Sequence, residues 1–467
     1  MDELRRRRLR ALACKYVRPG PRYTSYPTAV EFGPLEASEY EARLARASTR
    51  VDEPWSAYVH VPFCAKRCSF CACSVIATPE RARVEAPYVD HLVREIELVG
   101  ERLGERRKLA QLHLGGGTPT YLSPAQLDRA LAALARVFWR EPDSEWSIEL
   151  DARATSDAHL ELLGRWGFRR ISLGVQDLDA EVQRQIGRVQ SSARIVEVIR
   201  RARALGIAGV NLDLVYGLPA QTHASIRRTI AGVLELLPDR LALYGYAHLP
   251  SSPGRGNQRS IDESRLPSPS ERLDMFLAAR EQLLDAGYVA IGMDHFALPD
   301  DPLARAARAG SLRRNFMGYA VAAGSDLLGF GVTAIGEVGG AIVQNHSKLA
   351  RWSAAIDAGR LPTARGLIRS ADDELRAAVI GDLMCRGEVD KRAIEGRFGL
   401  ASFDEHFAVE LAELRGAITD GLLCDEAKQL VLSEEGRLFV RNVAMSFDAH
   451  LRARRDAAAA MRFSATV

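Results

Sequence analysis

The stretch Cys64-Ala65-Lys66-Arg67-Cys68-Ser69-Phe70-Cys71 places three thiols within eight residues, and Cys73 follows two positions later. The apolar run 55–61 leads directly into it and is typical of a buried strand. The 467-residue chain has seven cysteines, an odd number, which argues against a disulfide framework. A cluster of thiols at the end of a predicted first strand therefore indicates metal chemistry in a reducing cytosol.

The spacing of Cys64, Cys68 and Cys71 favours an iron–sulfur cluster, because thiolate is the usual ligand of cubane iron. Structural zinc sites normally combine two Cys or Cys/His pairs that a longer span separates, and no second pair lies nearby. Buried structural cysteines are a further alternative. Three ligands leave one iron of a [4Fe–4S] cluster open. An open iron can bind the amine and carboxylate of S-adenosylmethionine (SAM).

Strand-like and helix-like segments alternate after the cysteines, which predicts an α/β fold of parallel β/α units. Strands are expected at 111–114, 146–150, 171–175, 210–215, 241–246 and 289–293, and helices include 87–102, 124–138 and 192–205. At least six such units indicate a barrel or a partial (β/α)6 barrel. Site residues should then lie at the carboxyl ends of the strands.

Three regions are expected along the chain. Residues 1–50 form an N-terminal arm, 51–360 the barrel and 361–467 a helical C-terminal domain. The last region has helical patterns at 373–385, 391–398 and 403–420, followed by an alternating stretch at 430–433 and a helix from 436. Helices with a short hairpin suggest a winged-helix-like domain, which we interpret as a structural subdomain because no basic face is concentrated there.

Charge and hydropathy exclude some classes of protein. The chain carries 63 basic and 60 acidic residues, which argues against a dedicated nucleic-acid binder. No apolar run approaches the roughly 18 residues of a membrane span. We therefore expect a cytoplasmic enzyme, a monomer, with neither a nucleic-acid nor a membrane partner.

Several long motifs resemble the oxygen-independent coproporphyrinogen III oxidases of bacterial haem biosynthesis, within the radical SAM superfamily. The resemblance covers nearly the whole chain. Its motifs are PRYTSYPT (21–28), YVHVPFC (58–64), GGGTPT (115–120), GVQD (174–177), DLVYGLP (213–219), YAHLP (246–250), GMDHF (292–296) and RNF (314–316).

The resemblance implies a radical SAM barrel, a [4Fe–4S] cluster on Cys64, Cys68 and Cys71, and two SAM molecules per active site. Cys73 matches an extra cysteine that is not a ligand in this family. The positions that match SAM contacts are Tyr58, Phe70, Gly116, Gly117, Thr118, Glu149, Gln176, Arg188, Asp213, Ala247 and Ile335. Of these, Gln176, Arg188 and Asp213 match the second SAM.

The implied reaction converts coproporphyrinogen III to protoporphyrinogen IX by removing hydrogen from the β-carbon of a propionate, with loss of CO2 and one electron, on two propionates in turn. Flavodoxin or ferredoxin is the expected kind of electron donor. Arg22 and Tyr23 are candidates for holding the tetracarboxylate substrate, because charged and hydroxyl groups suit carboxylates. The arm that carries them is expected to cover the barrel mouth.

Other readings stay open at this point. A paralogous radical SAM methyltransferase or decarboxylase, a haem chaperone and a zinc-bearing winged-helix regulator all share part of the pattern. Three departures from the family bear on the substrate: Met317 replaces a Gln, Ala320–Ala323 replaces polar residues, and Ser251–Asn257 replaces bulky apolar ones.

Overall fold

The computed structural model describes residues 3–252, 254–321, 324–456 and 463–466. A 13-stranded sheet dominates it, in the order β1-β17-β16-β15-β14-β2-β5-β6-β7-β8-β9-β11-β10. The central strands pair in parallel. They are β14 (Asp326–Phe330), β2 (Trp55–Val61), β5 (Lys108–Gly116), β6 (Trp139–Leu150), β7 (Arg170–Gln176), β8 (Gly209–Tyr216) and β9 (Arg240–Gly245).

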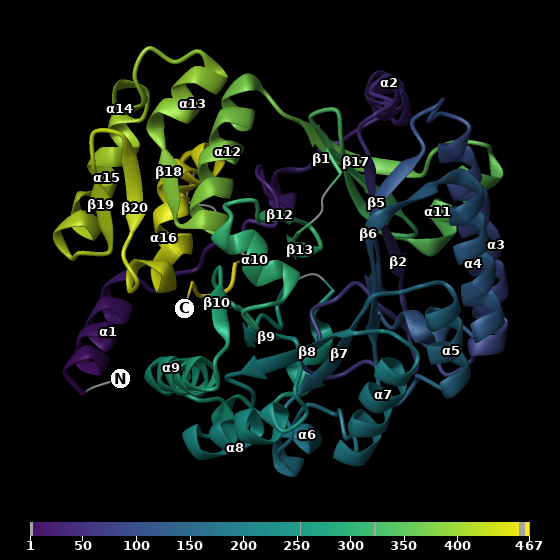
Figure 1. Cartoon of the computed structure of the whole chain (residues 1–467), viewed down its shortest axis with the longest axis horizontal. Helices are drawn as coiled ribbons and strands as arrows, with labels where there is room; N and C mark the ends of the chain where they lie inside the picture. Colours follow the sequence, from purple (N-terminus) through teal and green to yellow (C-terminus); the bar gives the residue numbers. More distant parts are fainter. Residues whose placement is uncertain (1–2, 253, 322–323, 457–462, 467) are drawn as a thin grey trace.

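Helices on the outside of the sheet connect these strands (Figure 1). They are α3 (Arg81–Gly100), α4 (Pro124–Val137), α5 (Asp157–Arg165), α6 (Ala180–Gln185), α7 (Ser192–Ala204), α8 (His223–Leu234) and α9 (Pro269–Asp285). Their apolar stripes cover the outer face, as the helical periodicity predicts. The central strands are buried on both faces, which explains why β2 is mostly apolar at successive positions, with Ser56 and His60 as its polar residues. The predicted α/β partial barrel is therefore confirmed.

Antiparallel strands extend both edges of the sheet. On one side lie β15 (Ile335–Val338), β16 (Ala341–Asn345), β17 (Thr363–Ile368) and β1 (Gly33–Pro34), and on the other β11 (His295–Ala297) and β10 (Val289–Ile291). The expected sixth parallel strand at 289–293 is wrong, since β10 pairs antiparallel with β11. Counting from β2, the sixth parallel strand is β9.

The C-terminal region contains α12 (Ala371–Arg386), α13 (Lys391–Phe398), α14 (Phe403–His406), α15 (Ala408–Thr419), α16 (Val440–Ala444) and α17 (Ala449–Asp456). A small antiparallel sheet joins them, in the order β18 (Glu388–Asp390), β20 (Gln429–Leu432) and β19 (Leu423–Asp425). The helices and the short hairpin are as expected, and the likeness to a winged helix stays a prediction. The boundary expected at 361 is too early, because β17 belongs to the main sheet.

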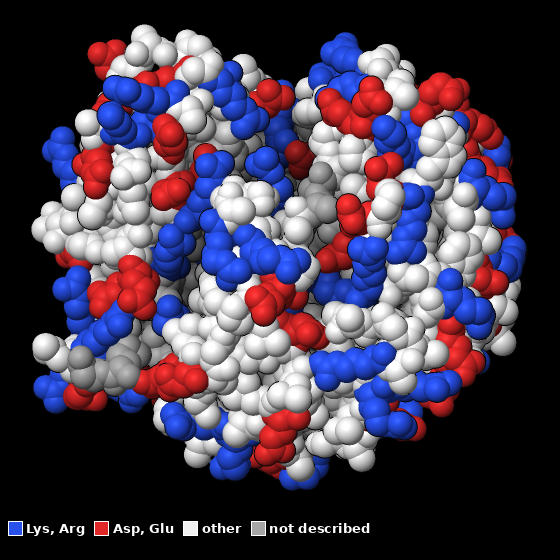
Figure 2. Space-filling view, in the orientation of Figure 1, with Lys and Arg blue, Asp and Glu red and all other residues white. Residues whose placement is uncertain are grey.

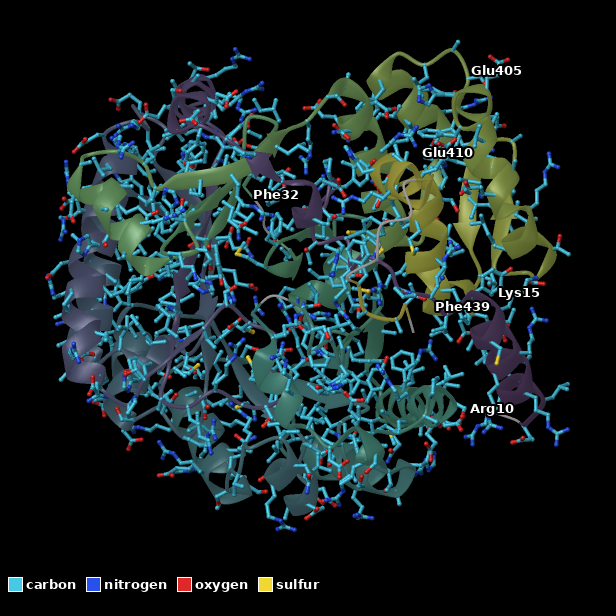
Figure 3. All side chains as sticks on the ribbon, turned by 180° about the vertical axis from the view of Figure 1, so that it is seen from behind. Arg10, Lys15, Phe32, Glu405, Glu410 and Phe439 are labelled. Carbon is cyan, nitrogen blue, oxygen red and sulfur yellow. The ribbon has the colours of Figure 1, made fainter. Side chains whose placement is uncertain are left out.

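The N-terminal arm is divided between the two regions. Its helix α2 (Ala37–Ser48) leads into β2, whereas α1 (Glu3–Tyr16) lies between α9 and the C-terminal domain (Figure 1). Arg10 donates to Asp274 of α9 at 3.0 Å, and the ring centre of Tyr16, the residue after Lys15, lies 5.9 Å from that of Phe439 in the C-terminal domain. Figure 3 labels Arg10, Lys15 and Phe439. The helix α1 therefore joins the barrel to the C-terminal domain and does not cover the barrel mouth.

The remaining elements are short. They are β3 (Phe63–Cys64), β4 (Ile76–Ala77), α10 (Pro302–Arg308), α11 (Leu349–Asp357) and the hairpin of β12 (Arg313–Asn315) and β13 (Gly318–Ala320). On the face drawn in Figure 2, basic and acidic side chains are interspersed, in keeping with the balanced composition.

Candidate active site

A cavity of about 1350 Å3 opens at the carboxyl ends of the parallel strands. Ligands of parallel α/β sheets bind at this edge. Most of the predicted site residues line the cavity, and they come from strand ends and loops that are far apart in the sequence. These residues are Arg22, Cys64, Cys68, Phe70, Cys71, Gly116, Gly117, Thr118, Glu149, Gln176, Arg188, Asp213 and Ala247.

The cysteines lie on one wall of this cavity. Cys64 is in the short strand β3, and the loop after it folds so that the Cys71 amide donates to the Cys68 carbonyl at 3.3 Å. The hydrogen bond from the Cys73 thiol lowers the pKa of Cys71. Within the described ranges, no three His, Cys, Asp or Glu side chains are close enough together to hold a single metal ion. Thiolates of a cubane cluster bind different irons, so three convergent but separated thiols fit such a cluster.

Positive charge surrounds Cys68. The Nη1 atom of Arg188 lies 3.8 Å from the Cys68 sulfur and 2.9 Å from Asp151 Oδ2. Arg153 also binds Asp151, at 2.7 Å. The arrangement therefore suits an anionic cluster on this wall.

The glycine run after β5 allows the chain to pass very close to the cysteine strand. A Cβ atom on Gly117 would lie 2.6 Å from the Phe63 carbonyl oxygen, and Gly116 has a φ of +109°. Next to them, Thr118 Oγ1 lies 3.4 Å from the Cys64 sulfur. Only glycine fits these two positions, so the run brings backbone groups to the cavity wall.

Glu149 faces the cavity from the end of β6. Its carboxylate accepts hydrogen bonds from the Gly116 amide at 3.1 Å and from His113 Nε2 at 3.4 Å. Enclosure by the protein alone would raise the pKa of Glu149, but His113 and the Gly116 amide outweigh this effect and lower it. A carboxylate held ionised in this way can accept hydrogen bonds from a ligand.

Gln176 and Asp213 line the same cavity from β7 and β8. Gln176 has a φ of +67°, in the left-handed region, where β7 is irregular against β8. Asp213 accepts from Ser172 Oγ at 2.9 Å and from Asn211 Nδ2 at 2.9 Å. Burial, and then the charge of Glu149, raise the pKa of Asp213.

Arg22 reaches the cavity from the N-terminal arm. It forms an ion pair with Asp294, and its guanidinium lies 5.4 Å from the ring centre of Tyr244. Burial alone would raise the pKa of Asp294, but Arg22 and His295 lower it. With 34% of its side chain exposed, Arg22 keeps a surface toward the cavity.

Three predicted residues lie outside the cavity lining. The Tyr58 hydroxyl contacts His60 Nδ1 at 3.0 Å, and its ring stacks on His113, a partner of Glu149. Ile335 is in β15, at the side of the sheet. The buried Tyr23 donates to Asp448 at 2.9 Å, so its hydroxyl is engaged with the C-terminal domain.

Comparisons with known proteins agree with this geometry. The family model of the radical SAM superfamily matches residues 58–231, and that of the HemN C-terminal domain matches 370–439. The oxygen-independent coproporphyrinogen III oxidase of Pseudomonas aeruginosa is 44% identical over 443 residues, covering 94% of this chain and 95% of that protein. The oxidase of Escherichia coli is 42% identical, covering 95% of both chains. The chain belongs to the oxygen-independent coproporphyrinogen III oxidase family.

A solved structure extends the likeness to three dimensions. The coproporphyrinogen III oxidase HemN from Escherichia coli, described as a radical SAM enzyme, superposes with a TM-score of 0.88 and 41% identity. It covers 92% of this chain and 98% of its own. Membership of this oxidase family implies a [4Fe–4S] cluster and SAM as cofactors, and the convergent thiols of this chain fit that cluster.

Beyond the matched motifs of the oxidase family, the cavity has walls that sequence reasoning missed. Asp151 follows Glu149 by two residues at the end of β6, a position that could have suggested it. Phe463 and Ser464 also line the cavity but carry no local signal, because they reach it through the tertiary fold. The basic residues Lys66, Arg67, Arg81, Arg153 and Arg255 also line the cavity.

The three departures from the oxidase motifs have different positions. Met317 and Ala320 belong to the β12–β13 hairpin region, and neither lines the cavity. Residues 322–323 and 253 lie outside the described residues. The segment 251–257 contributes Arg255 to the cavity and is the departure that reaches the site.

Proposed function

We propose that the chain converts coproporphyrinogen III to protoporphyrinogen IX without oxygen, inside the cavity at the strand ends. The observation that carries the proposal is the convergence of Cys64, Cys68 and Cys71 with Glu149 and Arg188 on one cavity. The names of the relatives support the substrate. The proposed conversion of coproporphyrinogen III to protoporphyrinogen IX is a step of haem biosynthesis.

In this proposal Cys64, Cys68 and Cys71 would hold the cluster through their thiolates, and SAM would bind to the cluster at the position that has no protein ligand. When bound, the cluster and SAM together supply a 5′-deoxyadenosyl radical that takes hydrogen from the β-carbon of a propionate. Arg188 contributes positive charge beside Cys68. The chain itself positions both reactants and keeps water away.

Two SAM molecules are proposed to share the cavity. For the first, Gly116, Gly117 and Thr118 offer backbone and hydroxyl groups, and the ionised Glu149 accepts hydrogen bonds. For the second, Gln176, Arg188 and Asp213 offer an amide, a guanidinium and a carboxyl group. The aromatic ring of Phe70 and the backbone at Ala247 contribute further walls, and Tyr58 acts indirectly through His113. Ile335 remains a proposed SAM contact on the family match alone.

The charge of the cavity suits a tetracarboxylate. Seven basic residues line it against four acidic ones, and three of the acidic ones, Glu149, Asp151 and Asp213, already have internal partners. Carboxylates favour guanidinium partners, which can donate two parallel hydrogen bonds. Arg22 and Arg255 reach the cavity from two segments outside the strands, and we propose both as propionate ligands. Tyr23 then acts by anchoring the backbone next to Arg22.

The segment after α1, residues 18–22, and the segment 463–466 lie side by side at the cavity wall. The Gly20 amide donates to the Ser464 carbonyl at 3.0 Å, and the Thr466 amide donates to Arg18 at 3.0 Å. The buried Arg441 binds both segments, donating to Pro21 at 2.9 Å and to Ala465 at 2.7 Å. Such a closure excludes water from a reactive site.

The reaction also needs an external electron donor, for which we propose a flavodoxin- or ferredoxin-like protein. Among the described residues, no helix is long and apolar enough to cross a membrane. We further propose that the enzyme acts as a monomer in the cytoplasm.

The proposal is tested by anaerobic reconstitution of the cluster, followed by incubation with SAM, dithionite and coproporphyrinogen III. Mass spectrometry should show loss of two CO2 and formation of two vinyl groups. Cys68→Ala should abolish this conversion, whereas Cys424→Ala, at an exposed cysteine of β19, should not. Formation of 5′-deoxyadenosine without CO2 loss would reject the substrate and leave the radical class standing.

A further inference from the structure

One side chain from the segment 251–257, which differs from the family motif, binds the backbone of the cysteine loop, Cys68–Cys71. Asn257 lies in the 3-10 helix Gly256–Ser260. Its Nδ2 donates to the carbonyl oxygens of Cys68 at 2.9 Å, Ser69 at 3.0 Å and Cys71 at 3.0 Å. These partners are 186 to 189 residues away in the sequence. The contact therefore joins two distant loops directly at two of the proposed ligands.

The orientation of this amide is fixed by its surroundings. Three carbonyl oxygens surround Nδ2, and an amide oxygen in its place would face three other acceptors. The two N–H groups of Nδ2 then donate to three carbonyl oxygens, so one N–H is shared between two of these acceptors. The other end of the amide, Oδ1, is buried and has no hydrogen-bond partner among the described residues. The amide is thus held by its donors alone.

The next residue, Gln258, also binds the backbone of the cysteine loop. The fully buried Gln258 donates from Nε2 to the Phe70 carbonyl at 3.0 Å and to the Ala247 carbonyl at 3.1 Å. Two adjacent side chains therefore bind all four carbonyls from Cys68 to Cys71. Neither side chain lines the cavity, so both bind the loop on the side that faces away from it.

From this geometry we propose that Asn257 is a positioning residue for the cluster. By holding the carbonyls of Cys68 and Cys71, it fixes the backbone from which both thiolates project toward the cavity. The proposal rests on the proposed assignment of these cysteines as cluster ligands. Preorganised supporting contacts of this kind commonly raise metal affinity about 10- to 100-fold.

The test compares three variants of the reconstituted, anaerobic protein. Asn257→Ala removes the donors, and Asn257→Asp replaces them with a carboxylate oxygen that faces three carbonyls. Asn442→Ala is the matched control, because Asn442 also donates to one backbone carbonyl, at 2.6 Å, and also has a buried Oδ1 without a partner. The measurements are the rate of iron release to a chelator, the EPR spectrum of the reduced cluster and the unfolding temperature of the cluster-free protein.

We expect Asn257→Ala to release iron about tenfold faster than the wild type, with an altered EPR spectrum. Asn257→Asp should release it at least as fast. The cluster-free Asn257→Ala protein should unfold at a somewhat lower temperature than the wild type, because its amide donors to backbone carbonyls are lost, as they are in Asn442→Ala. Asn442→Ala should unfold at a lower temperature but keep the wild-type release rate and spectrum.

Release rates and EPR spectra of both Asn257 variants within twofold of the wild type would overturn the proposal. If Asn257→Ala does not fold, Asn257→Ser, which keeps one shorter donor, should show intermediate release, and wild-type release there would equally contradict it. These readouts need no porphyrinogen. A faster release together with unreacted coproporphyrinogen III would therefore reject the proposed substrate and support the role of Asn257.

Discussion

The guanidinium beside Cys68 should raise the reduction potential of the cluster. Arg188 Nη1 lies 3.8 Å from the Cys68 sulfur, and only 9% of the Arg188 side chain is exposed. A single charge at about 4 Å contributes about 4 kcal/mol at an effective dielectric constant of about 20. The Asp151 carboxylate, at 2.9 Å from the same nitrogen, stays in place when Arg188 is replaced, so it does not cancel this difference, but salt and solvent screen it. If about a third remains, it is about 1.4 kcal/mol, or about 59 mV for one electron.

Arg188→Met removes the charge and keeps a side chain of similar length. Reduction adds negative charge to the cluster, so the potential of this variant should fall by roughly 60 mV. Arg188→Lys keeps the charge but loses the planar fork, so its potential should stay near that of the wild type while its affinity for SAM falls about tenfold. The assay is a redox titration of the reconstituted protein, followed by EPR.

A matched control comes from an exposed arginine. Arg129 pairs with Asp90 on the outer helices, and Arg129→Met should leave the potential unchanged. An unchanged or higher potential in Arg188→Met would refute the electrostatic reasoning. If the reduction potential falls equally in Arg188→Met and Arg188→Lys, the packing of the side chain, rather than its charge, determines the potential.

Four further outcomes are expected. Glu149→Gln should weaken SAM binding about tenfold in calorimetry, because an ionised acceptor is lost; unchanged binding would place SAM elsewhere. Cys73→Ser should keep the full iron content of the reconstituted protein, and loss of iron would identify Cys73 as a ligand. Arg106→Met leaves the carboxylate of Asp326, which it binds at 2.7 Å, without its buried partner. Because Arg50 still pairs with Asp326, this should lower the free energy of unfolding by about 3 kcal/mol in urea titrations, the lower end of the cost of breaking a buried ion pair. Although burial alone would raise it, two neighbouring arginines hold the pKa of Glu145 at about 2, against 4.5 when unfolded. Its contribution is thus complete above pH 4.5 and is lost as the pH falls toward 2, and Glu145→Gln should flatten the pH dependence of urea unfolding in this range.

Local sequence signals were sufficient for the central strands and the cysteine wall. The predicted run 55–61 coincides with β2, and the glycines after β5 lie where close backbone approach requires them. Both features depend on properties of a few consecutive residues. Apolar runs predict buried strands, and thiol spacing predicts ligands, without knowledge of the partner strands.

The direction and partners of a strand are not local properties. The segment 289–293 has the apolar pattern of a strand, but its pairing with β11 is decided by the tight connection between them. Similarly, β17 contains Arg365 and Gly366, so its sequence hides a strand that belongs to the main sheet. Both differences arise at the edges of the sheet, where burial constrains the residue type least.

Residues that reach the cavity through the tertiary fold were the hardest to predict. Nothing near Phe463 or Ser464 indicates a cavity wall, and Asn257 was visible only as a departure from a family pattern. Tyr58 shows the opposite case, since β2 is buried on both faces and its alternation does not reveal which face meets the cavity. The sequence motif marked Tyr58, but in the structure its ring stacks on His113 and it lies outside the cavity lining.

The central claim is that a radical formed at the cysteine wall attacks the propionates of coproporphyrinogen III. The direct measurement uses anaerobic, reconstituted protein and coproporphyrinogen III deuterated at the β-carbons of its propionates. The account predicts deuterium in 5′-deoxyadenosine and one CO2 released for each vinyl group formed. Unlabelled 5′-deoxyadenosine, or label transfer without any vinyl product, would contradict it.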